Sequence, residues 1–195
     1  MQRTGKCERN TKETQVAVEI NLDGEGRSEI NTGIGFFDHM LVLLAKHSMT
    51  DMKITCKGDL EVDCHHSVED TGIALGAAIL NALGGKESIN RFGSATIPMD
   101  EALAFAAVDI SGRPYLVYEG PLSGLRCGEY EVQCTEEFFR AVCFNAGITL
   151  HVKALYGRND HHMIEGMFKA FGRALRQAAE TDPRMKGVPS TKGVL

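Results

Sequence analysis

Two short segments of this chain carry a pair of adjacent histidines followed by a glutamate at the same distance. Residues 65–69 read HHSVE and residues 161–165 read HHMIE, and together they hold four of the seven histidines. Imidazole nitrogens and carboxylate oxygens are ligands that divalent first-row metal ions commonly take in proteins. The sequence therefore predicts a metal site that an internal duplication has built.

The spacing within each segment predicts where its side chains point if the segment opens a helix. The first histidine and the glutamate are then four residues apart and the second histidine and the glutamate three, so both histidines share a helix face with the carboxylate. The two adjacent histidines differ in direction by about 100° around the helix axis. We therefore expect each pair to address two different ions, or one ion and one substrate, which favours a dinuclear site.

Apolar residues recur with the periods of strands and helices, and these patterns follow the same order in both halves of the chain. The first half is predicted to have strands over 14–22 and 27–32, a helix around 36–44, a strand over 52–56 and a helix over 68–83. The second half is predicted to have strands over 103–110 and 115–118, a helix over 136–145, a strand over 148–155 and a helix over 163–180.

This order predicts an α+β fold made of a tandem pseudo-repeat of two strand–strand–helix–strand–helix halves. Each half would be a β-sheet with two helices packed on one face. We place the first half at residues 1–90, the second at 91–180 and a C-terminal tail at 181–195, with the linker between the halves near 84–100. The three parts are expected to form one integrated catalytic unit.

Aligning the two halves identifies further candidate ligands. His39 lies in the helix that precedes the first histidine pair, and the equivalent position of the second half is Glu137. We predict both as ligands, with a carboxylate in the second half where the first half has an imidazole. His151 aligns instead with Lys53 on a predicted strand, and we expect it not to bind metal.

Composition and charge argue against several classes of protein. Apolar residues make up 43% and charged residues 24%, which is ordinary for a globular domain. A net charge of −5, without a basic stripe, argues against a nucleic-acid partner. The six cysteines form no CxxC pair, which favours reduced thiols in a cytoplasm. No apolar stretch reaches the length of a membrane span, so we expect neither a secretory leader nor a membrane partner.

Longer motifs run in order along the chain. They are GFFDHML (35–41), DCHHSVEDTGIALG (63–76), INRFG (89–93), MDEAL (99–103), DISGRPYL (109–116), NDHHMIEGMFKAFGRALRQA (159–178) and PSTKGVL (189–195). In these motifs the sequence closely resembles the imidazoleglycerol-phosphate dehydratase family of histidine biosynthesis, over essentially its whole length. The resemblance implies the monofunctional form, without the phosphatase domain that some relatives carry.

The resemblance implies a hydro-lyase that converts imidazole-glycerol phosphate to imidazole-acetol phosphate with two manganese ions per active site. It also implies trimers that assemble into a shell of twenty-four subunits, with active sites between subunits. The implied metal ligands are His39, His65, His66, Glu69, Glu137, His161, His162 and Glu165, where Glu137 replaces a histidine of the family. The implied substrate contacts are Glu13, Arg91, Arg113, Lys169, Ser190 and Lys192, the last five forming a phosphate pocket to which the tail contributes.

We expect the imidazole ring to drive the reaction, because the hydrogen to be removed is not acidic. If each ring nitrogen meets one metal ion, the ring is held as an imidazolate that can expel the adjacent hydroxyl and leave a diazafulvene-like intermediate. That intermediate acidifies the neighbouring C–H bond, and a carboxylate then takes the proton. Glu13 is the candidate base because it is not expected to bind metal, and Glu165 or Glu69 would serve instead if it leaves the metal.

Two other functions fit the same set of ligands. A dinuclear metallohydrolase would use a metal-bound hydroxide and act on phosphate esters. A metal-storage or purely structural metal protein would keep its ions but bind no phosphorylated imidazole. The sequence leaves open the native metal, the partition of the ligands between two ions and the identity of the base.

Overall fold

Alternating residues turn one face of each long strand toward the interior, as a half-buried sheet requires. In a computed structural model of the protein, which describes residues 2–195, the strand at Thr14–Asn21 buries Val16, Val18 and Ile20. The corresponding strand of the second half, Ala102–Asp109, also buries every second residue, but three of its four buried side chains are alanine. Small side chains on that strand allow a helix to approach the sheet closely.

The two halves contain the same elements in the same order. The first half consists of β1 (Thr4–Asn10), β2 (Thr14–Asn21), β3 (Ser28–Asn31), α1 (Gly35–Ser48), β4 (Asp51–Gly58) and α2 (His65–Leu83). The second half consists of β5 (Phe92–Met99), β6 (Ala102–Asp109), β7 (Tyr115–Glu119), α3 (Cys134–Ala146), β10 (Thr149–Tyr156) and α4 (Asp160–Ala179), with a small hairpin of β8 (Arg126–Cys127) and β9 (Tyr130–Glu131) before α3.

The two four-stranded sheets repeat the same topology. Their strand orders are β1-β2-β4-β3 and β5-β6-β10-β7. In each sheet the last strand of the half pairs antiparallel with the second strand and parallel with the third. The predicted α+β class and the two-half pseudo-repeat are therefore confirmed.

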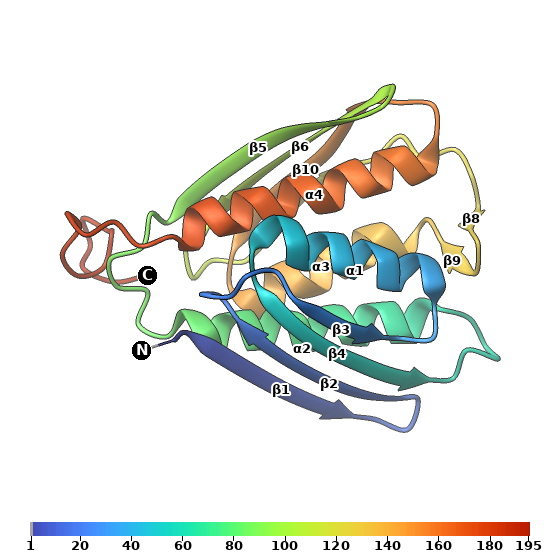
Figure 1. The fold of residues 1–195 in the computed structure, drawn as a ribbon, viewed down its shortest axis with the longest axis horizontal. Helices are drawn as coiled ribbons and strands as arrows, with labels where there is room; N and C mark the ends of the chain where they lie inside the picture. Colours follow the sequence, from blue (N-terminus) through green and yellow to red (C-terminus); the bar gives the residue numbers. More distant parts are fainter. Residues whose placement is uncertain (1) are drawn as a thin grey trace.

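The four helices lie between the two sheets (Figure 1). α1 and α2 pack on the first sheet and α3 and α4 on the second, while α1 also packs on α4 and α2 on α3. A stack of aromatic rings joins the layers, because Phe138 of α3 lies 5.3 Å from Phe37 of α1 and 5.0 Å from Phe168 of α4, measured between ring centroids. All three side chains are fully buried, so the halves share one core.

All four helices begin at the same end of the molecule, and residues 181–195 lie at the opposite end (Figure 1). Helix N-termini carry partial positive charge and favour acidic groups nearby. The first turns of α1, α3 and α4 contain such groups, namely Asp38, Glu136, Glu137 and Asp160. Among the described residues, no helix combines the length and the apolar character needed to cross a membrane.

Each half begins with a strand that the sequence did not predict, and the hairpin of β8 and β9 was not predicted either. β5 occupies 92–99 of the region 84–100 that was expected to be a linker, and that expectation is corrected. Both strands carry a glycine where a helix crosses them: a Cβ atom on Gly5 would collide with the Ala78 carbonyl of α2, and one on Gly93 with the Ala174 carbonyl of α4. Glycine at these crossings interrupts the apolar alternation by which strands are recognised in a sequence.

Candidate metal and substrate site

Each histidine pair opens a helix, as the spacing argument assumed, although the apolar period had placed the two helix starts at residues 68 and 163. α2 begins at His65, whose backbone N–H donates to the Asp63 carboxylate at 2.7 Å, and α4 begins one residue before His161, whose N–H donates to the Asn159 side chain at 2.9 Å. These side chains satisfy N–H groups that have no partner within the helix. The adjacent rings stand nearly perpendicular, with interplanar angles of 86° for His65 and His66 and 79° for His161 and His162.

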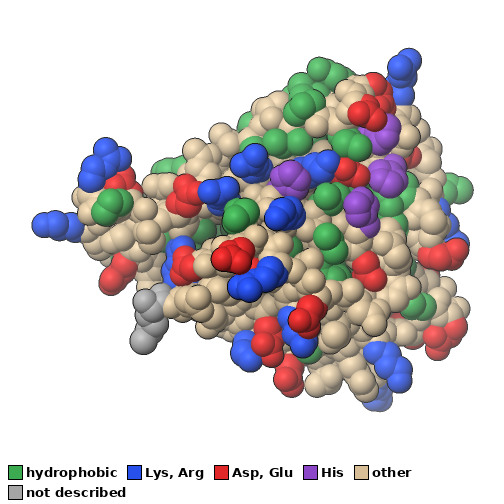
Figure 2. All heavy atoms as spheres, viewed as in Figure 1, with side chains coloured by type: hydrophobic (Ala, Val, Ile, Leu, Met, Phe, Trp, Pro, Cys, Tyr) green, Lys and Arg blue, Asp and Glu red, His purple; other side chains and the backbone are tan. Residues whose placement is uncertain are grey.

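One group of potential ligands is already tightly assembled. His39 Nε2 lies 3.5 Å and His161 Nε2 3.2 Å from Glu165 Oε2, and one ligand atom from each of the three residues lies within 4.8 Å of the others. We call this group the His39 cluster. It joins α1 of the first half to α4 of the second, so the packing of these helices builds it. Figure 2 shows histidine side chains gathered near acidic groups at the end of the molecule where these two helices begin.

The charge of Glu165 is maintained despite its burial. Its side chain is only 7% exposed, and Lys169 Nζ lies 2.5 Å from its Oε1. Burial would raise the pKa of this carboxyl, but the hydrogen bond and the charge of Lys169, together with His39 and His161, lower it below its usual value. The carboxylate is thus ionised and presents its Oε2 atom to two imidazole nitrogens. Such a mixed nitrogen and oxygen set suits a divalent first-row ion.

The pseudo-equivalent group in the first half is more open. His65 Nε2 lies 3.7 Å from Glu69 Oε2, and both side chains are about two-fifths exposed. Glu137 occupies the position equivalent to His39, because each residue lies ten positions before the left-handed residue that ends its helix, Gly147 or Met49. Its carboxylate lies 3.5 Å from Arg140 Nε, and within residues 2–195 no ion pair or ligand cluster joins it to His65 or Glu69. The ligand role of Glu137 remains a prediction.

The second histidine of each pair faces different carboxylates from the first. His66 Nδ1 lies 3.1 Å from Asp59 Oδ2, and His162 Nδ1 lies 2.7 Å from Glu101 Oε2. These hydrogen bonds raise the pKa of both imidazoles, and the hydrogen bond from His162 is the main cause that lowers the pKa of Glu101 to about 2. Neither Asp59 nor Glu101 was predicted from the sequence to have a role. Glu101 does lie in the MDEAL motif, which was the available signal.

The candidate base lies beside the second histidine of the first half. Glu13 Oε2 is 4.0 Å from His66 Nε2, and the Glu13 side chain is about half exposed. Glu13 immediately precedes β2, at the tip of the β1–β2 hairpin. The structure thus brings this predicted residue to the histidine-rich end of the molecule.

Most of the predicted phosphate contacts lie far from the histidines. Arg91 Nε pairs with Asp109 Oδ1 at 2.7 Å, and Arg91 Nη1 donates to the Pro189 carbonyl at 3.0 Å. Arg113 Nη2 lies 3.9 Å from the same Asp109 carboxylate. The neighbouring Ser190 Oγ accepts a hydrogen bond from the backbone N–H of Lys192 at 3.2 Å. Arg91, Arg113, Ser190 and Lys192 therefore form a group beside the tail, which we call the basic end group.

The distance between the two groups follows from the length of α4. The backbone N–H of Arg91 donates to the carbonyl of Ala178 at the end of α4, seventeen residues beyond His161. At about 1.5 Å of rise per residue this separation is about 25 Å along the helix. Lys169, the fifth predicted phosphate contact, lies with Glu165 instead. A single chain therefore does not bring all the predicted substrate contacts together.

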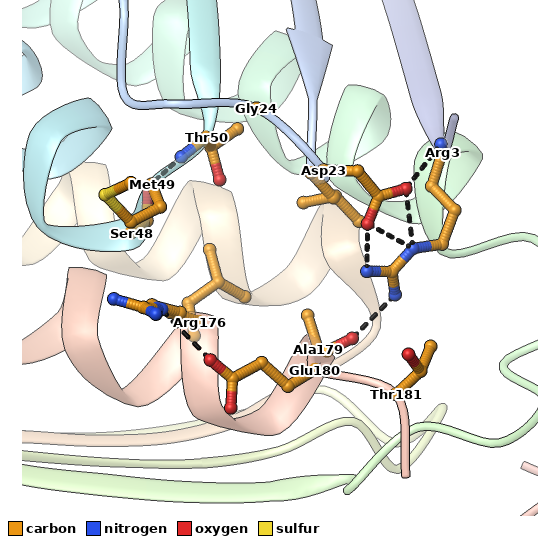
Figure 3. Close-up of a pocket in the computed structure, with 12 residues that line it drawn as sticks. Arg3, Asp23, Gly24, Ser48, Met49, Thr50, Arg176, Ala179, Glu180 and Thr181 are labelled. Atoms are coloured by element: carbon orange, nitrogen blue, oxygen red, sulfur yellow. Dashed lines mark hydrogen bonds and ion pairs between the residues drawn. The ribbon is translucent and has the colours of Figure 1, made fainter. Parts of the chain in front are cut away.

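A cavity of about 350 Å³ lies between the end of α4, the end of α1 and the loop after β2 (Figure 3). Its walls include the ion pair between Arg3 and Asp23 and the ion pair between Arg176 and Glu180. None of the predicted site residues lines it. It is therefore separate from both groups described above.

Comparison with known proteins decides the family. The sequence model of imidazoleglycerol-phosphate dehydratase matches residues 32–175. The chain belongs to the imidazoleglycerol-phosphate dehydratase family. It is therefore an enzyme of the hydro-lyase class, from a family of histidine biosynthesis.

Individual dehydratases are similar over nearly the whole chain. Imidazoleglycerol-phosphate dehydratase of Acetivibrio thermocellus is 60% identical, with all of both chains covered, and that of Symbiobacterium thermophilum is 59% identical, with 100% of this chain and 93% of the relative covered. The crystal structure of the Staphylococcus aureus enzyme has a TM-score of 0.83 at 42% identity, covering 92% of this chain and 99% of that one. The Pyrococcus furiosus structure, with a compound named (S)-C348, also has a TM-score of 0.83, at 40% identity, covering 96% and 99%.

Proposed function

We propose that this protein is a metal-dependent imidazoleglycerol-phosphate dehydratase that holds two divalent cations, with manganese as the expected metal. Membership of the dehydratase family gives the reaction, and the His39 cluster is the single observation that carries the metal dependence. Three ligand atoms within 4.8 Å of one another, one of them from a buried and ionised carboxylate, fit a cation that accepts both nitrogen and oxygen. The open pair of His65 and Glu69 is the pseudo-equivalent position for a second cation.

Bound cations would supply Lewis-acid charge that stabilises the imidazole ring of the substrate in its deprotonated form. The residues of the chain then orient the substrate and move its proton. Once hydroxide has left the carbon beside the ring, the neighbouring C–H bond becomes acidic. Glu13, exposed and 4.0 Å from His66, takes that proton in this proposal.

The basic end group binds the substrate phosphate, together with Lys169. Arginine and lysine side chains are well suited to a dianion because their hydrogen bonds to it are charge-assisted. The separation of about 25 Å along α4 is far larger than the substrate, so we propose that the basic end group of one subunit faces the histidines of another. Self-association, as a shell of twenty-four subunits built from trimers, would provide this arrangement. We also place the protein in the cytoplasm, because all six cysteines are free.

Metal removal tests the proposal. We expect the chelator-treated protein to lose dehydration of imidazole-glycerol phosphate and to recover it when Mn²⁺ is added back. Glu165→Gln should retain less metal by elemental analysis and should not recover. Full activity of a verified metal-free sample would refute the metal dependence, and metal-dependent hydrolysis of phosphate esters without any dehydration would show a metallohydrolase instead.

A further inference from the structure

Asp59 and Glu101 lie outside every role described so far, yet each touches one of the proposed ligands. Both contact Nδ1 of the second histidine in a pair, at 3.1 Å for Asp59 and His66 and at 2.7 Å for Glu101 and His162. A carboxylate only accepts hydrogen bonds, so the proton of each neutral imidazole must be on Nδ1. The lone pair is then on Nε2, the nitrogen left for a cation.

The Nε2 atoms of these two histidines have no hydrogen-bond partner among residues 2–195. The nearest carboxylates on that side are Glu13, at 4.0 Å from His66, and Asp100, at 3.8 Å from His162. Neither distance is that of a hydrogen bond. Each ring is therefore held at one nitrogen and open at the other.

The carboxylate of Glu101 is itself held in place. Its Oε1 atom accepts the backbone N–H groups of Arg158 and Asn159, at 3.0 and 2.9 Å, just before α4 begins. The other oxygen, Oε2, is left for His162. Within residues 2–195, the Asp59 side chain forms such a contact with His66 alone, through both of its oxygens at 3.1 and 3.2 Å. Glu101 thus fixes its ring more firmly than Asp59 does.

The two contacts come from positions that are not equivalent in the repeat. Asp59 follows β4, whereas Glu101 immediately precedes β6, and its counterpart before β2 is Glu13, which lies on the Nε2 side of His66. The repeats thus share a carboxylate at Nδ1 of the second histidine without sharing the residue position that supplies it. If the contact were only a remnant of the duplication, the same repeat position would supply the carboxylate in both halves.

We propose that Asp59 and Glu101 are positioning residues that fix the Nδ1–H tautomer of His66 and His162 and aim Nε2 at the metal. This inference rests on the proposed function, because it assumes that the two histidines bind cations. Carboxylates behind a ligating histidine orient the ring and increase its basicity, and their loss typically weakens metal binding about 10–100-fold.

Glu101→Gln is the sharpest variant. The amide oxygen of the new side chain can still accept hydrogen bonds from the backbone N–H groups of Arg158 and Asn159. The NH₂ group of the amide then faces His162. An NH₂ group donates to Nδ1 and so favours the Nε2–H tautomer, which cannot bind a cation without losing that proton. We expect Mn²⁺ affinity, measured by competition with a chromogenic chelator, to fall about 10–100-fold for one of two ions. Asp59→Asn should reduce affinity for the other ion by a smaller factor.

Asp100→Asn is the matched control, because it removes the neighbouring negative charge on the Nε2 side without touching Nδ1. Its side chain is about three-quarters exposed, so we expect a loss of no more than about fivefold. Nitrogen-15 spectra of the metal-free proteins should show His162 with its proton on Nδ1 in the wild type and in Asp100→Asn, and on Nε2 in Glu101→Gln.

Three outcomes are distinguishable. Wild-type protein that binds no Mn²⁺ would refute the proposed function and this inference with it. Wild-type protein that binds two ions, with Glu101→Gln binding as tightly or losing no more than Asp100→Asn, would refute the positioning role alone. A selective loss in Glu101→Gln together with the change of tautomer would support it.

Discussion

At the scale of residues, different chemical types gather at the two ends of the molecule. Imidazoles and carboxylates gather where the helices begin, and guanidinium and ammonium groups gather beside the tail. Arg91 is engaged by Asp109 and by the Pro189 carbonyl, whereas the exposed Lys192 uses only its backbone N–H in this group. Lys192 is therefore free to turn toward a substrate phosphate.

We predict that Lys192→Ala raises KM for imidazole-glycerol phosphate about 10–100-fold, the value of a lost charged hydrogen bond, and lowers kcat much less. The remote phosphate contact would bind the ground state and the transition state alike. Steady-state kinetics with Lys186→Ala, another exposed lysine of the tail, as the control should show this split. A fall in kcat with an unchanged KM would contradict the phosphate-binding role.

At the scale of elements, close approach between a helix and a strand or another helix determines where the side chains of the site lie. Gly76 of α2 packs on α3, where an added Cβ would come within 2.6 Å of the Val142 carbonyl, and Gly172 of α4 packs on α1, within 3.1 Å of the Leu44 carbonyl. The α1–α4 contact is the one that brings His39 to Glu165. Gly93 plays the corresponding part between β5 and α4.

We predict that Gly93→Ala lowers the free energy of unfolding of the metal-free protein by about 1–3 kcal/mol or more. The added methyl group would collide with the backbone of α4 and displace it. Gly35→Ala is the control, since a Cβ there would meet nothing within 4 Å and its φ is not in the left-handed region. Denaturant unfolding curves would compare the two. Equal stability of both variants would show that β5 and α4 are less closely packed than described.

At the scale of the whole molecule, the two groups of the proposed site lie at opposite ends of α4. If both groups act on one substrate molecule, as we propose, one subunit must complete the site of another. The two halves of each subunit are in turn joined by their shared helical core and by Arg3, which pairs with Asp23 and donates through Nη1 to the Ala179 carbonyl at the end of α4 (Figure 3).

We predict that two variants that are each impaired at low substrate partly restore activity when they assemble together. Glu165→Gln removes a metal ligand, and Lys192→Ala removes a phosphate contact. In oligomers of co-expressed subunits, about a quarter of the sites should take an intact metal group from one subunit and an intact phosphate group from another. We therefore expect about a quarter of wild-type activity at low substrate. Each variant assembled alone is the control. No recovery in verified mixed oligomers would place the whole site within one chain.

We also predict that the Arg3–Asp23 pair supports folding only above acidic pH. The hydrogen bond from Arg3 lowers the pKa of Asp23 below its ordinary 3.8, so its contribution is present above the unfolded pKa and is lost as the pH falls through the folded value. Asp23→Asn should cost at most about 1 kcal/mol near neutral pH, and progressively less as the pH falls below the ordinary pKa of 3.8. Denaturant unfolding of the metal-free protein at neutral and acidic pH, with Glu61→Gln as a surface control, measures the difference.

The sequence by itself determined the features that are local along the chain. Residue spacing within five positions showed which side chains share a face if each histidine pair opens a helix. Apolar periodicity located ten of the helices and strands and their repeated order, with the starts of α2 and α4 placed three residues too late. Matching the halves also paired His39 with Glu137, and their equal distance from the helix ends agrees with that alignment. These features depend on backbone periodicity, which the order of residue types records directly.

Only the tertiary structure decided what lies together across long stretches of chain. It revealed the strands β1 and β5. Each carries a glycine because a helix crosses it closely, and no local period in the sequence indicates that crossing. It placed Asp59 and Glu101 behind the second histidines, and it separated Arg91 from Lys169 along α4. Such contacts arise from packing between elements distant in sequence, and neither residue type nor spacing specifies which loop will reach a given side chain.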